Sequence, residues 1–390
     1  MAYSVFESDA RIRRHCESLA RAGHRVLFLG LGSSDQPRVS RRNGVMLVCA
    51  ARRRYRGGSI LRYFLAYTRF IAFSLWTLNR RVRTRRLQTV QTNNLPNALG
   101  IVGWLMRRRG VVWVHDVHDP EPELFRSKFG IGVVGRAGGA VLQLIERTIF
   151  RRADRVLLAN PPTTRMLSEL GALEDTRWRV IPNLPDERIF GLTPPRPKGT
   201  KRIVFHGTLT RRYNLEVVLR ALAEIRKVEA DIAFDVIGSG DQLDPLRRLA
   251  RELDLGPSVA FSGCLVPLEQ IPRLIRDAVV GVVPLRRDAF VDAVFPTKLL
   301  EYVRLGIPCV VTPTVAVTRA FPVGTLLYAA DDRAADWHRA LRVALTEKVD
   351  IMRMAAAAQT LPIVQAWQEV EAQYVTFVAQ GTGTRSPGIS

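Results

Sequence analysis

Three short motifs in the second half of the chain combine glycine with charged side chains where strands are expected to meet helices. The first covers Val204–Leu209 (VFHGTL) and is followed by Arg211 and Arg212. Gly207 would let a ligand approach the backbone, Thr208 follows it in the turn, and the two guanidinium groups could grip a diphosphate. The N-terminus of the next expected helix would also attract an anion. The motif predicts an anion site, with two solvated arginines as the alternative.

The second motif, Ile237–Asp241 (IGSGD), repeats this device at the end of the next expected strand. Ligands of open α/β sheets bind beyond the carboxyl ends of the strands. Gly238 and Gly240 are therefore expected to border the same ligand. The alternative is an ordinary glycine-containing turn between a strand and a helix.

The third motif is Phe295–Tyr302 (FPTKLLEY), which reads as the start of a helix. Pro296 favours the first helical position, so Thr297 and Lys298 in the first turn would face the same anion. Glu301 lies one turn later on the same face and could accept two hydrogen bonds from the hydroxyl groups of a ribose. The alternative is a surface glutamate paired with a neighbouring basic side chain.

In the first half, His118 and Asp119 follow an expected strand and lie among further acids and prolines. A neutral imidazole there could donate a hydrogen bond to a sugar hydroxyl or a departing phosphate. The alternative is a loop histidine bonded to Asp119. A metal site that also uses His115 and Asp116 is disfavoured, because adjacent residues of a strand point to opposite faces.

These motifs need parallel sheets to position them, and the pattern of short β-branched runs alternating with helical segments predicts such sheets. Strands are expected at 25–29, 45–49, 87–90, 111–114, 155–158, 179–181, 203–206, 232–237, 259–261, 279–283 and 309–311. Only Ala2–Phe6 precedes the first helix, so the first strand is expected to be very short or missing. The pattern as a whole predicts an α/β protein of two doubly wound, Rossmann-like domains that face a cleft.

Domain boundaries follow from composition, because Phe190–Thr200 (FGLTPPRPKGT) is rich in Pro and Gly. The expected order is a first domain at 1–189, a linker at 190–200 and a second domain at 201–361. A final helix at 362–380 is expected to pack back on the first domain, and 381–390 are expected to be a disordered tail. Four scattered cysteines exclude a disulfide scaffold and suit a cytoplasmic protein.

The net charge of +22 belongs to one half of the chain, because residues 1–200 carry 35 basic and 15 acidic side chains. Seventeen arginines and no acid occur in residues 36–115. Such a surface would attract phosphate groups, so anionic lipid is the expected partner of the 36–115 region. Nucleic acid is not expected, because the stretch contains no recognisable reading motif.

The segment 60–79 is long and apolar enough to raise the question of membrane contact. Arg62, Arg69 and Arg80 fall on one line along a helix, opposite a broad aromatic face. Three interpretations remain open: a core helix whose arginines extend to solvent, an interfacial helix on anionic lipid, and a spanning helix.

Taken together, the three motifs make residues 201 to about 345 resemble the donor domain of retaining GT-B glycosyltransferases of family 4. In that family two glutamates separated by seven residues precede a small helix. Glu301 matches the second glutamate, whereas Ala293 occupies the position of the first. The resemblance therefore leaves the usual sugar contact to Asp292, one position away, or to Asp288.

The first half resembles the same family, and specifically a bacterial exopolysaccharide or cell-surface glycan subgroup. Ser8–Arg14 and Ala22–Val26 are similar to the family's opening helix and turn, and Trp113–Leu124 (WVHDVHDPEPEL) is similar to its H-D/E-x-x-P-E stretch. The candidate residues on the acceptor side are Asp9, Arg11 and Asn94.

The resemblance implies a retaining, metal-independent transferase without a cofactor, whose co-substrate is a nucleotide-sugar. The acceptor would be a glycan or a lipid-linked molecule, and the enzyme would sit at the inner face of the membrane. Two alternatives remain: a nucleotide-sugar epimerase of the same fold, and a degenerate scaffold protein that has lost the first glutamate.

Overall fold

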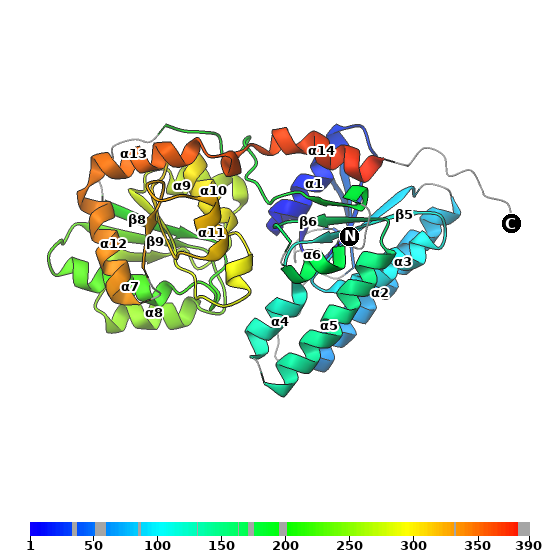
Figure 1. Ribbon diagram of the computed structural model, residues 1–390, viewed down its shortest axis with the longest axis horizontal. Coiled ribbons are helices and arrows are strands. Elements are labelled where there is room, and N and C mark those ends of the chain that lie inside the picture. The colour runs from blue at the N-terminus through cyan, green and yellow to red at the C-terminus, as the bar shows by residue number, and fades with distance from the viewer. Residues whose placement is uncertain are drawn as a thin grey trace. The chain divides into compact units, whose positions relative to one another are not determined.

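The computed structural model describes residues 1–32, 37–50, 60–84, 87–130, 132–162, 164–170, 175–194, 201–330 and 333–380 (Figure 1). It has two compact units, of which the first is Met1–Asn183 with the chain from Glu369 on, and the second is Leu184–Gln368. The sequence placed this boundary at 189. The segment after Leu184 belongs to the second unit because Arg304 holds it there, donating from Nε to the carbonyl of Phe190 (2.8 Å). Residues 195–200 and 381–390 lie outside the described residues.

The first unit contains a parallel sheet that carries the candidate histidine. Its strand order is β4-β5-β6-β7. The strands are β4 (Thr89–Asn93), β5 (Val112–Val117), β6 (Arg155–Leu158) and β7 (Trp178–Val180). Most of β5 is buried, as is typical of parallel strands covered on both faces.

A second, smaller sheet of the first unit has the order β1-β3-β2. Strand β1 (Leu27–Gly30) pairs in parallel with β3 (Val45–Cys49), and β2 (Val39–Arg42), which the sequence did not predict, pairs antiparallel with β3. The opening residues connect both sheets. The Ala2 amide donates to Leu29, the Leu31 amide donates to Ser4, and the Asn93 amide donates to Met1. In place of the expected short first strand, the chain has an opening segment that forms backbone hydrogen bonds with β1 and the residue after it on one side, and with β4 on the other.

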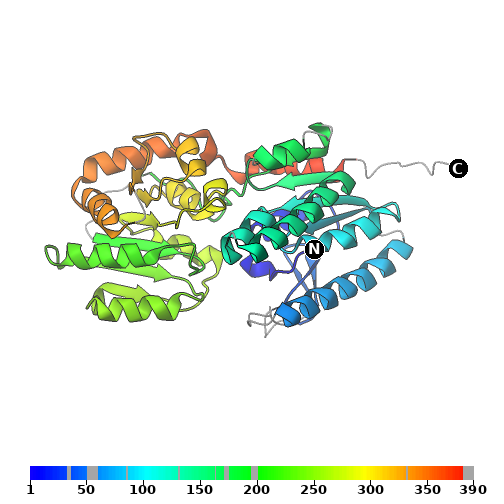
Figure 2. The same ribbon diagram turned by 60° about the horizontal axis from the view of Figure 1, so that its bottom comes forward.

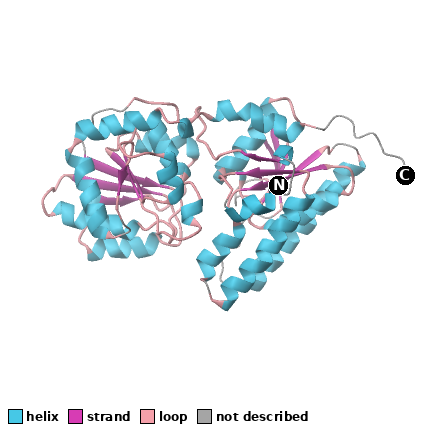
Figure 3. Cartoon of the chain, viewed as in Figure 1, coloured by secondary structure: helices cyan, strands magenta, loops and turns pink. Residues whose placement is uncertain are grey.

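Helices surround these sheets, as Figure 3 shows for both units. Those of the first unit are α1 (Ala10–Arg21), α2 (Ile60–Arg83), α3 (Gly100–Arg107), α4 (Glu121–Phe129), α5 (Val133–Arg152), α6 (Thr164–Leu170) and α14 (Trp367–Ala379). The ring of Tyr374 in α14 stacks on His15 of α1 (centroids 4.0 Å apart), and its hydroxyl donates to Gln91 in β4 (2.9 Å).

Helix α2 is the segment that raised the membrane question, and it lies along one side of the first unit (Figure 2). Phe70 and Leu78 are buried in the core. Arg62, Arg69, Trp76 and Arg80 are exposed, so an aromatic ring shares the arginine face instead of lying opposite it. Among the described residues, no helix is long and apolar enough to cross a bilayer.

The second unit has one parallel sheet with the strand order β10-β9-β8-β11-β12-β13. Its strands are β8 (Lys201–His206), β9 (Ile232–Ile237), β10 (Val259–Phe261), β11 (Val280–Val283), β12 (Cys309–Val311) and β13 (Leu327–Tyr328). Except for β13, these strands lie within two residues of their predicted bounds. All of them run in the same direction, so their carboxyl ends share one edge.

The helices of the second unit enclose this sheet. They are α7 (Leu215–Arg226), α8 (Leu243–Glu252), α9 (Ile271–Ile275), α10 (Thr297–Arg304), α11 (Val315–Ala320), α12 (Ala334–Thr346) and α13 (Lys348–Gln359). The apolar stripe of α7, with Val218, Leu222 and Ile225, packs against Trp337 of α12 and against the strands. The core therefore fixes β8, whose end opens the first motif.

Short 3-10 turns complete both units: η1 (Phe6–Ser8), η2 (Asn97–Leu99), η3 (Asp175–Arg177), η4 (Gly256–Ser258), η5 (Leu268–Gln270), η6 (Val291–Ala293) and η7 (Pro362–Val364).

Candidate functional site

The two glycine turns of the second unit pack against each other, backbone on backbone. The Gly207 amide donates to the carbonyl of Ile237 (2.9 Å), and the Leu209 amide donates to that of Ser239 (3.1 Å). A Cβ on Gly238 would lie 1.9 Å from the oxygen of Gly207, and one on Gly240 would lie 2.1 Å from that of Leu209. Gly238 and Gly240 are thus required for the turns to meet, and a ligand is not needed to explain them.

Lys298, in the first turn of α10, carries a buried ammonium group beside the first of these turns. The residue is 6% exposed. Nζ lies 3.1 Å from the ring centroid of Tyr213 and 4.0 Å from that of Phe205. Among the described residues Nζ has no hydrogen-bond acceptor. Gly207 has a φ of 119°, which side chains other than glycine rarely adopt, and a Cβ there would lie 3.3 Å from Nζ.

Burial lowers the pKa of Lys298 well below its usual value. The carboxylate of Glu301 raises that pKa in part, and the charge of Arg212 lowers it further. An ammonium with aromatic faces but no hydrogen-bond acceptor is a costly group to bury. An anion that entered the turn would remove much of this cost.

Glu301, one turn further along α10, is buried next to a histidine that the sequence analysis did not select. Nε2 of His206 lies 3.1 Å from Oε2 of Glu301. The His206 backbone amide donates to the hydroxyl of Tyr302 (3.1 Å). His206 is the last residue of β8, and its position at the carboxyl end of a central strand is the signal that could have identified it.

The remaining donor candidates differ in exposure. Thr208 and Arg211 are exposed, whereas Arg212 and Thr297 are half-buried. The guanidinium carbon of Arg212 lies 4.4 Å from the centroid of the Phe290 ring. The charge of Arg212 lowers the pKa of Lys298, which indicates that the two cations lie near each other. The sequence analysis grouped Gly207, Lys298 and Glu301 with either Arg211 or Arg212. In the structure, Arg212 is the arginine whose charge acts on Lys298.

Asp292, which is expected to replace the missing glutamate, forms local contacts with its carboxylate. Its Oδ1 accepts from the amide of Val315 at the start of α11 (3.2 Å) and lies 3.6 Å from Arg287. Asp288 likewise caps a backbone turn, accepting from the amide of Val291 (2.7 Å). Both carboxylates thus have local partners that stabilise the turn around Ala293.

Helix α10 is also anchored at its other end. Besides the bond to Phe190, Arg304 donates from one terminal nitrogen to the carbonyl of Val364 (3.0 Å). The Gln359 side chain donates to the carbonyls of Thr193 (2.7 Å) and Arg304 (3.1 Å). The two segments through which the chain enters and leaves the second unit are thereby tied to the helix that carries Lys298.

In the first unit, Arg11 forms a buried ion pair instead of facing an acceptor. Its Nε and one terminal nitrogen donate to the two oxygens of Asp116 (3.2 and 2.8 Å), and its other terminal nitrogen donates to the carbonyl of Ile181 (2.6 Å). Arg11 is 2% exposed. Each of its three nitrogens has a partner inside the unit, so Arg11 has a structural role here, and its assignment to the acceptor stays a prediction.

His118 also bonds to Asp116. Its Nε2 lies 3.2 Å from Oδ2 of Asp116 and 3.2 Å from Oδ1 of Asn93. Burial opposes the charged imidazole, but the carboxylate of Asp116 outweighs it and raises the pKa of His118. Burial likewise opposes ionisation of Asp116, yet Arg11 and His118 hold its pKa well below the usual range. The environment therefore moves His118 towards the charged imidazole, whereas the sequence analysis considered a neutral one.

The other candidates of the first unit shape the loop that carries His118. Asn94 accepts from the amide of His118 (2.8 Å) and donates to the carbonyl of Asp119. Asn160 donates to the carbonyl of His118 (3.2 Å). The Asp9 carboxylate caps α1 by accepting from the amide of Ile12 (3.1 Å). Asn94 and Asp9 thus have structural partners, and Asp116 is the central residue that the sequence analysis considered only as a metal ligand.

Comparisons with known proteins match both units. A family model described as a glycosyl transferase 4-like domain matches residues 8–184, and one described as glycosyl transferases group 1 matches residues 200–347.

Two curated relatives match part of the chain. One is an alpha-monoglucosyldiacylglycerol synthase of Streptococcus pneumoniae, 24% identical over 44% of this chain and 41% of the relative. The other is a D-inositol 3-phosphate glycosyltransferase of Corynebacterium jeikeium, 28% identical over 55% of this chain and 54% of the relative. The chain therefore spans about half the length of each.

Solved structures resemble the whole chain. WaaG, a glycosyltransferase involved in lipopolysaccharide biosynthesis, is similar with a TM-score of 0.66, 16% identity and 95% coverage of both chains. The catalytic domain of starch synthase IV from Arabidopsis thaliana, bound to ADP and acarbose, gives 0.64 at 13% identity, covering 96% of this chain and 95% of that one. These likenesses confirm the expected GT-B fold class.

Proposed function

Because the chain belongs to the GT-B glycosyltransferases of the family 4 type, we propose that it is a retaining, metal-independent transferase. It would move a sugar from a nucleotide-sugar to a glycan or a lipid-linked acceptor at the cytoplasmic face of the membrane. In this proposal the reaction uses no cofactor, and the nucleotide-sugar is its co-substrate. The relative named as an alpha-monoglucosyldiacylglycerol synthase favours a lipid acceptor.

The observation that carries the proposal is the buried ammonium of Lys298, which has no hydrogen-bond acceptor among the described residues and lies beside the open face of Gly207. A donor diphosphate in this turn would be a strong acceptor for Nζ. Arg212 would supply a second positive charge, and the N-terminus of α10 would add backbone amides. Glu301 would accept the ribose hydroxyls while His206 fixes its carboxylate.

These groups stabilise the charge that develops on the diphosphate as the glycosidic bond breaks. The attack would come from the same face as the leaving group, and the leaving phosphate would take the proton of the acceptor hydroxyl. That route gives retention without a nucleophile of the protein. In the first unit, Asp116 holds Nε2 of His118 and so directs Nδ1 away from the carboxylate, which would let His118 bind an acceptor hydroxyl.

Turnover separates the proposal from its two alternatives. Nucleotide-sugars with uridine, guanosine and adenosine bases are first screened by thermal shift, and the one that stabilises the protein is incubated with cell membranes. Transfer of labelled sugar to lipid supports the proposal. Formation of an epimer would identify an epimerase, and the absence of any product would identify an inactive scaffold.

Membrane contact is a separate part of the proposal. The exposed face of α2 combines Arg62, Arg69 and Arg80 with Trp76, which suits a surface of anionic lipid headgroups. Other arginines of the 36–115 region, at 52–54, 56, 85 and 86, lie outside the described residues. Flotation should show binding to vesicles with anionic lipid and little to neutral ones, and replacing the three arginines of α2 by glutamine should weaken it. Equal binding to both vesicle types would contradict the electrostatic contact.

A further inference from the structure

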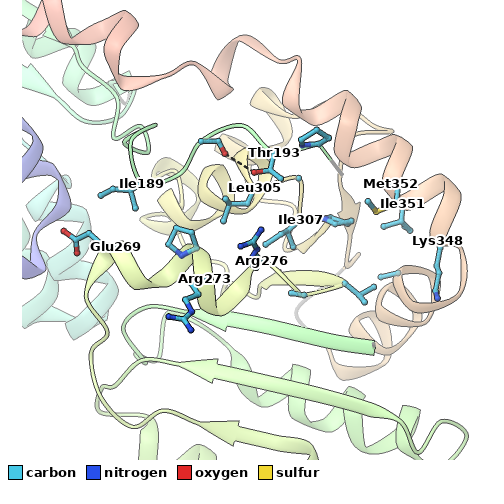
Figure 4. Close-up of a pocket in the computed structure, with 18 of the residues that line it drawn as sticks. Ile189, Thr193, Glu269, Arg273, Arg276, Leu305, Ile307, Lys348, Ile351 and Met352 are labelled. Carbon is cyan, nitrogen blue, oxygen red and sulfur yellow. Dashed lines mark hydrogen bonds between the residues drawn. The ribbon is translucent and has the colours of Figure 1, made fainter. Parts of the chain in front are cut away.

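The second unit contains a cavity of about 430 Å³ that the donor site does not use (Figure 4). Ala278 and Val279 directly precede β11, and Ile307 and Pro308 directly precede β12; all four line the cavity. The cavity therefore lies at the amino ends of these strands. Gly207 and the turn after β9 lie at the carboxyl ends of the same sheet, so the two sites are at opposite edges.

We propose that this cavity is a second ligand site, which binds an amphipathic organic phosphate. Its volume is within the range of small-molecule sites, about 300–1,000 Å³. The walls are largely apolar and include Leu305, Ile307, Ile351 and Met352. An apolar body of a ligand would be removed from water here, which favours binding.

The charges around the cavity select an anion. Its lining contains four basic residues and one acidic residue, Glu269. Arg273 and Arg276 lie three residues apart, at α9 and its C-terminus, and so fall on one side of the helix. Figure 4 shows Arg276 beside Leu305 and Ile307, with Arg273 next to it and Lys348 at the far end of the cavity. Each guanidinium group can bind a phosphate through charge-assisted hydrogen bonds.

The position of the cavity indicates an effector and not a second substrate. Part of the wall is Arg188–Pro194, in the segment through which the chain enters the second unit. This segment is the one that Arg304 and Gln359 tie to α10. A ligand in the cavity would therefore contact the residues that connect the units and the loop that follows α10, with no candidate donor residue in its lining.

Calorimetry with four probes tests this inference on the full-length chain. The probes are dihexanoylphosphatidic acid for a lipid source, 1-naphthyl phosphate for a soluble source, inorganic phosphate, and uncharged dihexanoylglycerol. We expect one or both of the organic phosphates to bind at least tenfold more tightly than the other two probes. No binding of either organic phosphate, or equal binding of phosphate or dihexanoylglycerol, would overturn the proposal.

Variants locate the bound probe. The double substitution Arg273→Glu with Arg276→Glu should weaken binding at least tenfold, whereas Arg251→Glu, an exposed arginine of α8 outside the lining, should not change it. Lys298→Met should also leave the affinity unchanged, because that residue belongs to the other edge of the sheet. Binding that survives the double substitution, or that is lost with Lys298→Met, would show that the probe binds elsewhere.

Discussion

The two units bury their charged groups in opposite ways. In the first unit, Arg11 and the carboxylate of Asp116 satisfy each other, and His118 completes the network. In the second unit, the ammonium of Lys298 lies against two aromatic rings without a hydrogen-bond acceptor among the described residues. A buried charge that is fully paired supports the structure, whereas one that is left without an acceptor is suited to a ligand of opposite charge. The comparison favours the second unit as the location of the proposed anion site.

The largest expected effect comes from breaking the paired network. Asp116→Asn leaves Arg11 buried without a counter-charge, so the free energy of unfolding should fall by about 3–5 kcal/mol. Urea denaturation measures this loss. The exposed pair of Arg353 and Asp350 is the control, and Asp350→Asn should cost less than about 1 kcal/mol. Equal effects of the two substitutions would show that the buried network is not what stabilises the first unit.

The second-largest expected effect is a loss of affinity for the nucleotide-sugar donor. Lys298→Met removes the ammonium but keeps an apolar side chain of similar length, so the dissociation constant of the donor should rise about 10- to 100-fold, or roughly 1.4–2.8 kcal/mol. The free energy of unfolding should stay the same or increase, because a costly buried charge is lost. Lys227→Met, at an exposed lysine paired with Glu224, is the control. Unchanged donor affinity by calorimetry would remove Lys298 from the donor site.

A third effect concerns Glu146, which shares Arg165 with Glu123 and Glu169. Burial raises the pKa of Glu146 to about 7, although Arg165 opposes this. Because the folded state favours the protonated acid, the contribution of Glu146 to the free energy of unfolding is fully present below about pH 4.5. This contribution is lost as the pH rises through 7. Glu146→Gln should therefore stabilise the protein at pH 8 by about 1–2 kcal/mol and flatten this slope.

The matched control for this prediction is Glu169→Gln, since Glu169 meets the same guanidinium from one turn along α6. It should keep a pH dependence between 4.5 and 7, moved slightly to lower pH because the charge of Glu169 is a minor cause of the raised pKa of Glu146. A slope that persists in Glu146→Gln would mean that another group titrates.

The smallest expected effect comes from His118. Its raised pKa means that the pair with Asp116 stabilises the fold below about pH 6.5, and that this contribution is lost as the pH rises through the folded pKa. His118→Gln should reduce the difference in stability between pH 6 and pH 9 by about 0.5–1 kcal/mol. His338→Gln, in α12, should not. If the difference in stability between pH 6 and pH 9 is unchanged in His118→Gln, the charged imidazole does not form a stabilising ion pair with Asp116.

The sequence predicted the second unit better than the first, and the reason is physical. Its strands are largely apolar runs, and β8 and β9 end in glycine turns, so their bounds and the positions of Gly207, Lys298 and Glu301 follow from local pattern. The short antiparallel β2, with Arg41 and Arg42, has no such signal, because its stability comes from pairing with β3.

The partners of several candidate residues are far away in the sequence, so the sequence alone could not predict these pairs. The partner of Arg11 is 105 residues away, and that of His206 is 95 residues along the chain at Glu301. No spacing rule links such positions, so Arg11 was assigned to an acceptor and His206 was overlooked. The environment of Asp292 depends in the same way on the start of α11.

The most direct test of the central claim is proton uptake when a nucleoside diphosphate binds. Between pH 8 and 10 the diphosphate is fully ionised, while the depressed pKa of Lys298 should rise when an anion occupies the site. Calorimetry in buffers of different ionisation enthalpy should therefore detect uptake of a fraction of a proton by the wild-type protein and none by Lys298→Met. Binding without proton uptake, or the same uptake in both proteins, would contradict the claim that Lys298 holds the donor diphosphate.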